Sequence, residues 1–213
     1  MKTDDFINLL AAGVAPVDRW ALAKRFLVAV LVGLLGALSL TVLKLGIRPD
    51  LAQVATTPIF WAKMALPLCL MIGALSTVVR LARPGVSPGS GRMLIVAAIL
   101  AVWIGSIYVL MAAVPDTRVA IVFGETWRVC AFNIAMLSIP GFIGVFWSLR
   151  GLAPTRLALA GACGGLLAGS MAAVAYSLHC PEMAVPFWGV WYVLGMAIPT
   201  VIGAVCGPKL LRW

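Results

Sequence analysis

Residues 93–114 read MLIVAAILAVWIGSIYVLMAAV, a run of 22 residues without a charged side chain. A helix needs about 20 apolar residues to cross the hydrocarbon core of a bilayer. The run does not alternate between apolar and polar residues, which is the pattern of a membrane β-barrel strand. This stretch therefore predicts a membrane-spanning helix.

Five further stretches of similar length and hydropathy fill most of the remaining chain: residues 25–44, 60–80, 129–149, 157–178 and 186–206. Hydrophobic residues make up 63% of the chain and charged residues 11%, and the mean hydropathy is +1.08. A soluble domain carries roughly a quarter charged residues, so this chain lacks the polar surface for a water-soluble shell. We predict an all-α integral membrane protein with a six-helix transmembrane bundle.

The predicted spans divide the chain into three parts. Residues 1–24 form a soluble arm, residues 25–206 the transmembrane domain and residues 207–213 a short tail. Two dozen mixed residues precede the first apolar stretch, which is longer than the core of a signal peptide, so we expect it to be retained.

Lysine and arginine indicate the orientation, because cytoplasmic connectors carry an excess of both. Eleven of these residues fall on the side of the N-terminus and five on the other: Lys2, Arg19, Lys24, Arg25, Arg80, Arg83, Arg92, Arg150, Arg156, Lys209 and Arg212 against Lys44, Arg48, Lys63, Arg118 and Arg128. This distribution predicts that both termini are cytoplasmic. It also accounts for the net charge of +9, so we expect no direct binding of nucleic acid.

Similar features recur between spans and suggest three related helical hairpins. The third and fifth spans share an Arg and a Gly-Ser pair, and the fourth and sixth share Ile-Pro followed by Ile-Gly. Chance agreement among residues common in membrane helices is the alternative. Pro67, Pro140 and Pro199 each remove a backbone hydrogen bond, which predicts either flexible points or fixed kinks. The glycine-rich fifth span predicts a slender face for close helix packing.

Several functional classes lack support in the sequence. Transporters and pumps usually keep a charged residue inside the membrane, and none lies near the middle of a predicted span; Lys63 is close enough to an entrance to extend towards water. No phosphate-binding glycine loop, nucleophile elbow or zinc-protease motif is present. We therefore expect no enzyme activity, no cofactor and no permanently bound metal.

Two of the five cysteines lie at the predicted outer face. Cys130 opens the fourth span, and Cys180 follows the fifth in the turn His179-Cys180-Pro181-Glu182. Their thiols could form a disulfide if the Cα atoms come within about 7 Å, or hold a soft metal ion together with His179 or Glu182. Arg128 would lower the pKa of Cys130, whereas apolar surroundings would raise it. Two unrelated membrane cysteines are the alternative.

The soluble arm begins with a short amphipathic pattern. Thr3 can cap a helix whose first turn holds Asp4 and Asp5. The apolar side chains of this helix are Phe6, Ile7, Leu9 and Leu10. A helix of roughly ten residues is marginal alone in water, so the bilayer, the protein's own loops or a partner must cover this face. Its acidic start disfavours an anionic membrane surface, and we expect a protein partner.

The whole chain resembles the NrsF family, the negative regulators of sigma factor F. The resemblance rests on residues 1–7 (MKTDDFI) with Leu9 and Leu10, Pro16 and Val17, residues 48–51 (RPDL), Pro58 with residues 60–63 (FWAK), residues 80–85 (RLARPG), residues 127–130 (WRVC), Pro140, residues 179–182 (HCPE), Trp188, Tyr192, Gly195 and Pro199.

This resemblance implies a multi-pass anti-sigma factor of the bacterial inner membrane. It implies that the arm binds an extracytoplasmic-function sigma factor, with Asp4, Asp5, Phe6, Ile7, Leu9 and Leu10 at the contact. It also implies that Cys130 and Cys180 respond to heavy metal or oxidative stress. A small permease that captures a metal or another solute with the same cysteines remains the alternative.

Overall fold

A computed structural model describes residues 3–5, 7, 12 and 20–212 of the chain. These residues form helices and no strands. Six helical segments are long and apolar enough to cross a membrane: Ala21–Leu45, Pro58–Leu81, Gly91–Ala112, Pro115–Arg150, Leu157–Tyr176 and Val185–Leu210. The predicted six-helix bundle is confirmed, with span ends that differ by a few residues except in the fourth.

Individual helices follow one another through short connectors. The first segment joins α2 (Ala21–Leu40) to a π-helical turn, η1 (Thr41–Leu45), and the fourth contains η2 (Pro115–Thr117), α6 (Arg118–Phe123), α7 (Trp127–Leu137) and α8 (Ile139–Arg150). The other elements are α3 (Leu51–Val54), α4 (Pro58–Leu81), α5 (Gly91–Ala112), α9 (Leu157–Tyr176) and α10 (Val185–Leu210).

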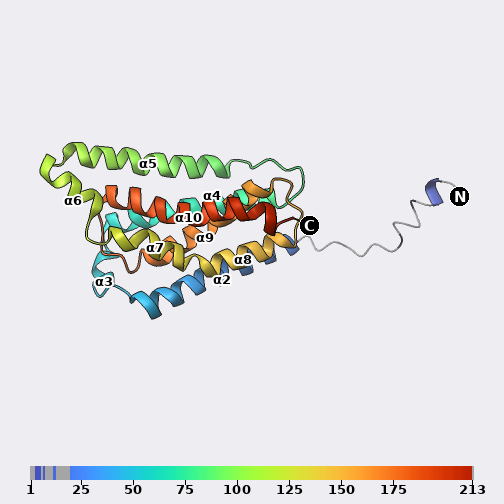
Figure 1. The fold of residues 1–213 in the computed structure, drawn as a ribbon, viewed down its shortest axis with the longest axis horizontal. Coiled ribbons are helices and arrows are strands. Elements are labelled where there is room, and N and C mark those ends of the chain that lie inside the picture. Colours follow the sequence, from blue (N-terminus) through green and yellow to red (C-terminus); the bar gives the residue numbers. More distant parts are fainter. Residues whose placement is uncertain (1–2, 6, 8–11, 13–19, 213) are drawn as a thin grey trace.

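The long helices run along one axis and give the bundle two distinct ends (Figure 1). At one end lie α3, α6 and residues 177–184, which connect α9 to α10; we call this the thiol end. At the other end α2 begins and α10 finishes; we call this the arm end. Cys130, in the first turn of α7, and Cys180, after α9, therefore lie at the opposite end of the bundle from the start of the first span.

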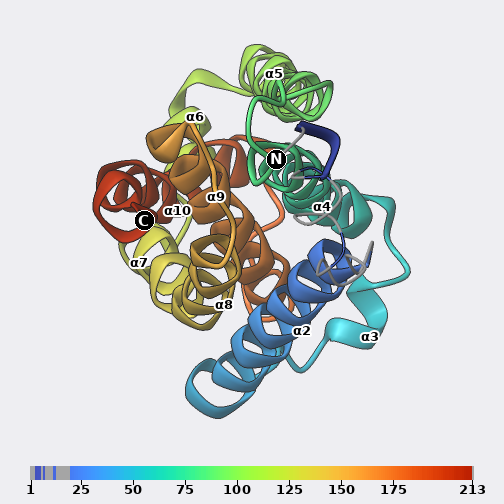
Figure 2. The same ribbon diagram turned by 90° about the vertical axis from the view of Figure 1, so that its right-hand side faces the viewer.

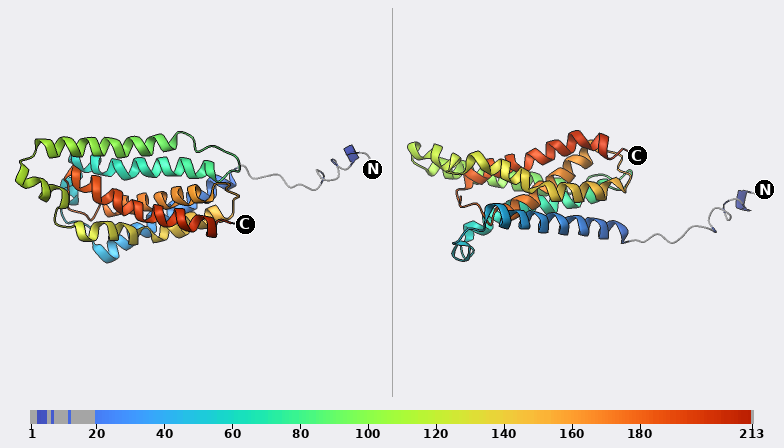
Figure 3. Two further views of the ribbon diagram at one scale, coloured as in Figure 1. Left: turned by 45° about the horizontal axis from the view of Figure 1, so that its top comes forward. Right: turned by 60° about the horizontal axis from the view of Figure 1, so that its bottom comes forward.

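Helix α9 occupies the middle of the bundle, and α5 lies at its margin (Figures 2 and 3). Most of α9 is buried, as expected for a helix surrounded by α2, α4, α8 and α10. By contrast, α5 packs only along α4 and α10 and leaves most of its apolar side chains exposed. In a membrane this exposed apolar surface faces lipid.

Small residues allow α9 and α10 to pack closely. A side chain at Gly161 or Gly165 would collide with the backbone of α10, and one at Gly203 would collide with Gly161. Close backbone approach through such residues is a common way to join membrane helices, where no hydrophobic effect separates helix from lipid. The slender face predicted for the fifth span is confirmed.

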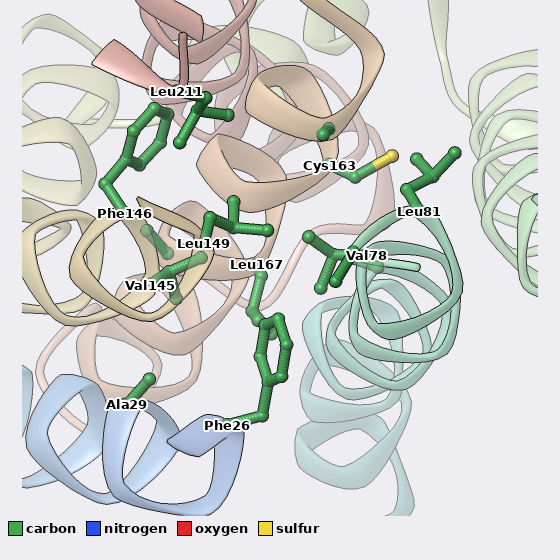
Figure 4. Packing of buried hydrophobic residues seen from close by; sticks show 14 of the residues in the cluster. Phe26, Ala29, Val78, Leu81, Val145, Phe146, Leu149, Cys163, Leu167 and Leu211 are labelled. Atoms are coloured by element: carbon green, nitrogen blue, oxygen red, sulfur yellow. The ribbon is translucent and has the colours of Figure 1, made fainter. Parts of the chain in front are cut away.

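An apolar core joins five segments near the arm end (Figure 4). Phe26 of α2 and Leu167 of α9 point into the same space as Val78 of α4 and Leu149 of α8. Leu211, which follows α10, completes it. This core holds the first span against the bundle close to the point where the arm begins.

Packing between consecutive spans is closest in the last hairpin, α9 with α10. Helix α2 instead packs along α8 and α9, and α4 packs along α9 and α5. Gly33 and Gly36 explain why α2 packs along α8, because they let α2 approach Pro140 and Gly141 of α8. The suggested series of three related hairpins therefore does not describe which helices pack together.

The fourth span is longer and less regular than its hydropathy predicts. Gly124 ends α6 at a φ of +53°, a conformation that favours glycine, and Ser138 separates α7 from α8. Pro140 occupies the first turn of α8, where its missing N–H costs little. Pro67 and Pro199, in contrast, lie buried inside continuous helices.

Candidate functional site

The thiol end contains the turn that follows α9 and holds Cys180. The backbone amides of His179 and Cys180 both donate to the carbonyl of Tyr176, at 3.0 Å each. Pro181 disfavours a helical conformation for the residue before it, so the chain leaves the helix there. Cys180 is thus held at a defined point between α9 and α10.

Cys130 comes from the first turn of α7, which packs against α9 and α10. Both cysteines have 0% exposure and belong to one apolar cluster. Both are free thiols, and their side chains lie close enough to interact with each other. The structure therefore brings together the two cysteines that the sequence placed only on the same face.

A buried cation lies beside this thiol pair. Lys63 of α4 is 0% exposed, and its Nζ donates to the carbonyl oxygens of Cys180 at 2.8 Å and Glu182 at 2.9 Å. The same ammonium lies 5.5 Å from the centre of the Tyr192 ring. The expectation that Lys63 extends towards water is wrong, because these backbone acceptors and the aromatic ring stabilise it inside the protein.

The surroundings of Cys180 favour its thiolate. The hydrogen bond from Cys130 lowers the pKa of Cys180, and the charge of Lys63 and the backbone N–H of Glu182 lower it further, whereas burial opposes them. A cation and hydrogen-bond donors stabilise the negative sulfur more than burial destabilises it. These surroundings therefore favour the thiolate form of Cys180, which is the form that acts as a nucleophile and as a metal ligand.

His179, Glu182 and Arg128, predicted as supporting residues, contact other groups. His179 Nδ1 hydrogen-bonds the Gly46 carbonyl at 2.9 Å. The Glu182 carboxylate accepts from the amides of Glu125 at 2.8 Å and Thr126 at 3.2 Å, at the start of α7. Within the described ranges, no group of three or more His, Cys, Asp and Glu side chains is arranged to hold a metal ion.

Arg128 does not approach the thiols. Its guanidinium lies over the ring of Trp127, 5.4 Å from the ring centre, on the exposed side of α7. Lys63 supplies the charge that acts on both sulfurs instead. A helix places positions 128 and 130 on different faces, so Arg128 points away from the thiol pair.

A second cation, Arg48, reaches the same turn from the connector that follows the first span. Arg48 donates through Nη1 to the Cys180 carbonyl at 3.3 Å and pairs through Nε and Nη2 with both carboxylate oxygens of Asp50 at 2.7 Å. This bidentate hydrogen bond raises the pKa of Arg48 and lowers that of Asp50. The Cys180 carbonyl thus accepts from two cations, Lys63 of α4 and Arg48 of the connector after the first span.

The predicted arm contact lies partly outside the described residues. Asp4, Asp5 and Ile7 are helical and exposed, and Ile7 has 56% exposure. Phe6, Leu9 and Leu10 fall outside the described part of the chain.

Arg48 and Lys63 are site residues that the sequence reasoning missed. Each is a charged residue bordering an apolar segment, which is the usual position of a side chain that extends to water. Their acceptors lie more than a hundred residues away in the chain. A signal existed in Lys63, since a cation inside a span is a candidate functional residue by default.

Comparisons with known proteins agree on one family. A family profile described as "Negative regulator of sigma F" matches residues 10–213. The chain is 43% identical over 213 residues to the "Probable anti-sigma-F factor NrsF" of Azospira oryzae and 38% identical over 218 aligned positions to the "Anti-sigma-F factor NrsF" of Caulobacter vibrioides, covering the full length of all three chains. No solved structure matches. With a profile match over nearly its whole length and two relatives aligned from end to end, the chain belongs to the NrsF family of negative regulators of sigma F.

Proposed function

We propose that this protein holds an extracytoplasmic-function sigma factor at the bacterial inner membrane through its N-terminal arm and releases it when Cys130 and Cys180 are modified. The observation that carries the sensing step is that two free, fully buried thiols share one cluster at the end of the bundle opposite the start of α2. Family membership supports the sigma factor as partner. The arm end then faces the cytoplasm and the thiol end faces outwards.

The arm supports sigma binding through its chemistry. Asp4, Asp5 and Ile7 are each helical and exposed, so a partner can contact carboxylates and an apolar side chain together. Short amphipathic helices commonly bind in a groove of another protein. A sigma factor whose polymerase-binding surface is occupied in this way cannot direct transcription.

The thiol pair supports two sensing chemistries. In oxidation, the two sulfurs form a disulfide and pass two electrons and two protons to an oxidant such as a peroxide or diazene. In ligation, the two sulfurs lose their protons and bind one soft metal ion, which thiolates prefer. Either change replaces the interaction between the Cys130 and Cys180 thiols with covalent or coordinate bonds of different geometry.

Release requires only a modest difference in free energy between the two states. A tenfold loss of sigma affinity corresponds to about 1.4 kcal/mol, and a ligand shifts an equilibrium by its differential affinity for two conformations. One altered contact in a fully buried cluster can supply a change of this size.

Co-purification of the sigma factor with membrane-embedded variants tests the proposal. We expect the intact chain to retain the sigma factor and to lose it after treatment with cadmium ion or diamide. Deletion of residues 1–20 should abolish retention. The double variant Cys130→Ser/Cys180→Ser should retain the sigma factor under both treatments, whereas Cys69→Ser, the matched control in α4, should release it.

Two results would contradict the proposal. Retention after deletion of residues 1–20 would remove the arm as the binding element. Release from the double serine variant would remove the thiol pair as the sensor. If retention is unaffected by deletion and cells take up solute only when both cysteines are present, the permease explanation holds instead.

A further inference from the structure

The proposed function leaves open how a change at the thiol end reaches the arm. We infer that Arg48 is the positioning residue that links the Cys180 turn to α2, the span that carries the arm. This inference rests on the proposed function and adds the residue through which its two ends communicate.

Three hydrogen bonds join the Cys180 turn to the segment that follows the first span. The backbone amide of Arg48 donates to the Leu178 carbonyl at 3.2 Å, and its Nη1 donates to the Cys180 carbonyl at 3.3 Å. His179 Nδ1 bonds the Gly46 carbonyl at 2.9 Å. The backbone and the side chain of Arg48 therefore bond the turn on both sides of His179.

The Arg48 side chain is held in place and is able to transmit displacement. Its exposure is 8%, and Asp50 fixes the other edge of its guanidinium by two bonds of 2.7 Å. Bidentate pairs of this kind restrict orientation as well as adding energy. When the Cys180 carbonyl moves, Arg48 must either follow it or lose that bond.

The connection from Arg48 to α2 runs through an irregular turn. Gly46, at φ 78° and ψ 160°, ends η1, and its amide donates to the Thr41 carbonyl at 2.9 Å. Single π-helical turns are frequent at functional sites, where a helix can change its hydrogen-bond register. The π-helical turn η1 therefore joins residues 46–48, which bond the Cys180 turn, to α2, a regular helix of 20 residues.

Helix α2 is suited to move as one body. Its buried residues are Phe26, Ala29, Gly33 and Ala37, which form a single stripe. Three of these four are Ala or Gly, so α2 lies close against α8 and α9, with the Met171 side chain seated at Gly33. A shift imposed at Arg48 can pass along α2 to residue 21, next to the arm.

No other cation at the site has this connection. Lys63 contacts the same Cys180 carbonyl but belongs to α4, whose far end leads into residues 82–90 and then α5. Glu182 contacts α7, which leads into α8. Leu40 and Leu45 of the first span pack against the apolar cluster that contains both cysteines, but among the hydrogen bonds of the described residues, those of residues 46–48 are the ones that join the Cys180 turn to the segment following that span.

The test uses the full chain in nanodiscs of phosphatidylethanolamine and phosphatidylglycerol, with purified sigma factor and N-ethylmaleimide as the thiol probe. The probe forms one S–C bond, and the thiol proton ends on the neighbouring carbon. We expect alkylation to weaken sigma binding at least tenfold in the unsubstituted chain. Before alkylation, we expect the sigma affinity of Arg48→Ala to lie within threefold of the affinity of the unsubstituted chain. After alkylation, we expect the affinity of this variant to fall less than twofold.

Protection of the Cys180 thiol by sigma factor supplies a readout that a purely structural role would not move, because a partner that stabilises the closed turn lowers the fraction of chains open to the probe. Peptide mass spectrometry measures the rate at which Cys180 is alkylated. Saturating sigma factor should lower this rate in the unsubstituted chain and leave it unchanged in Arg48→Ala. Arg118→Ala is the matched control, since Arg118 is an exposed arginine at the same end that bonds the Ala113 carbonyl five residues earlier in the chain. It should behave like the unsubstituted chain.

A tenfold loss of binding in alkylated Arg48→Ala would overturn the inference while leaving the proposed function intact. Absence of any loss in the unsubstituted chain would instead contradict the proposed function. Should Arg48→Ala fail to fold, hydrogen exchange of the unsubstituted chain decides. Alkylation should speed exchange at the amides of Gly46 and Arg48 and leave α6 unchanged; unchanged exchange at Arg48 would refute the link.

Discussion

At the scale of single residues, the burial of Lys63 has the largest energetic consequence. An ammonium removed from water is costly unless its donors are satisfied. Lys63 meets this requirement with two backbone carbonyls and the face of Tyr192. The turn around Cys180 and the cation therefore stabilise each other.

Replacement of Lys63 by methionine should destabilise the protein. The carbonyl of Glu182 would lose its Lys63 donor, and an unsatisfied buried polar group costs about 1–3 kcal/mol. Thermal unfolding in detergent, followed by size-exclusion chromatography of a fluorescent fusion, measures the change. Lys44→Met, at an exposed lysine of the same end, is the control and should unfold like the original; an unchanged melting temperature in Lys63→Met would contradict the role of Lys63.

Removal of Arg48 should raise the pKa of Asp50. In the folded protein the guanidinium holds the pKa of this carboxyl below its usual value, mainly through their hydrogen bonds. The pair therefore contributes stability above the pKa of Asp50 in the unfolded chain, and this contribution disappears as the pH falls through the lowered folded-state pKa. Because Asp50 is 45% exposed, the contribution is small.

Carbon NMR of labelled aspartate, assigned with Asp50→Asn, measures this titration. The midpoint for Asp50 should be higher in Arg48→Ala than in the unsubstituted chain and unchanged in Arg118→Ala. An identical midpoint in all three would mean that Arg48 does not pair with Asp50 in the membrane.

The contacts of individual site residues were the least predictable part of the protein. The sequence correctly placed Cys130 and Cys180 at one depth, because span boundaries fix depth. It could not show that their thiols touch, since that depends on α7 packing against α9 and α10. For the same reason, the sequence did not show that Lys63 is buried beside the thiols and Arg128 is exposed, because packing decides which side chain turns inward.

At the scale of helices, the seam between α9 and α10 is the most restrictive contact. A Cβ at Gly165 would collide with the Pro199 carbonyl, which is backbone and cannot rotate away. Gly165→Ala should therefore push the helices apart and destabilise the protein by about 1–3 kcal/mol, the usual cost of overpacking. Thermal unfolding in detergent checks this.

Gly105→Ala in α5 provides the comparison for that seam. Its Cβ would lie 3.6 Å from Val185 Cγ1, an ordinary contact, and alanine favours a helix over glycine by up to about 1 kcal/mol. This variant should be at least as stable as the original. Equal stability of the two variants would show that the α9–α10 contact is looser than described.

Helix existence was predictable, whereas helix continuity was not. Hydropathy is summed over about 20 residues, so it finds each span but averages over a local break. The breaks at Gly124 and Ser138 depend on backbone conformation, and η1 depends on hydrogen bonds around Thr41 and Gly46. None of these features changes the hydrophobicity of its segment.

At the scale of the whole molecule, six spans place both termini on one side of the membrane. We expect the lysine and arginine distribution to make this the cytoplasmic side. Green fluorescent protein fused to either terminus should fluoresce, and alkaline phosphatase should be active only when inserted near Asp116 in η2, at the thiol end. Phosphatase activity at the N-terminus would separate the arm from every cytoplasmic partner.

Complete burial of the thiols has a consequence for how quickly a cell could react. A reagent that must wait for the turn to open cannot act faster than the opening itself, whatever its dose. Above some dose, the delay before transcription begins would be constant, and bulky reagents would fail where small ones succeed. Such a protein would report how long a stress has lasted more faithfully than how intense it is.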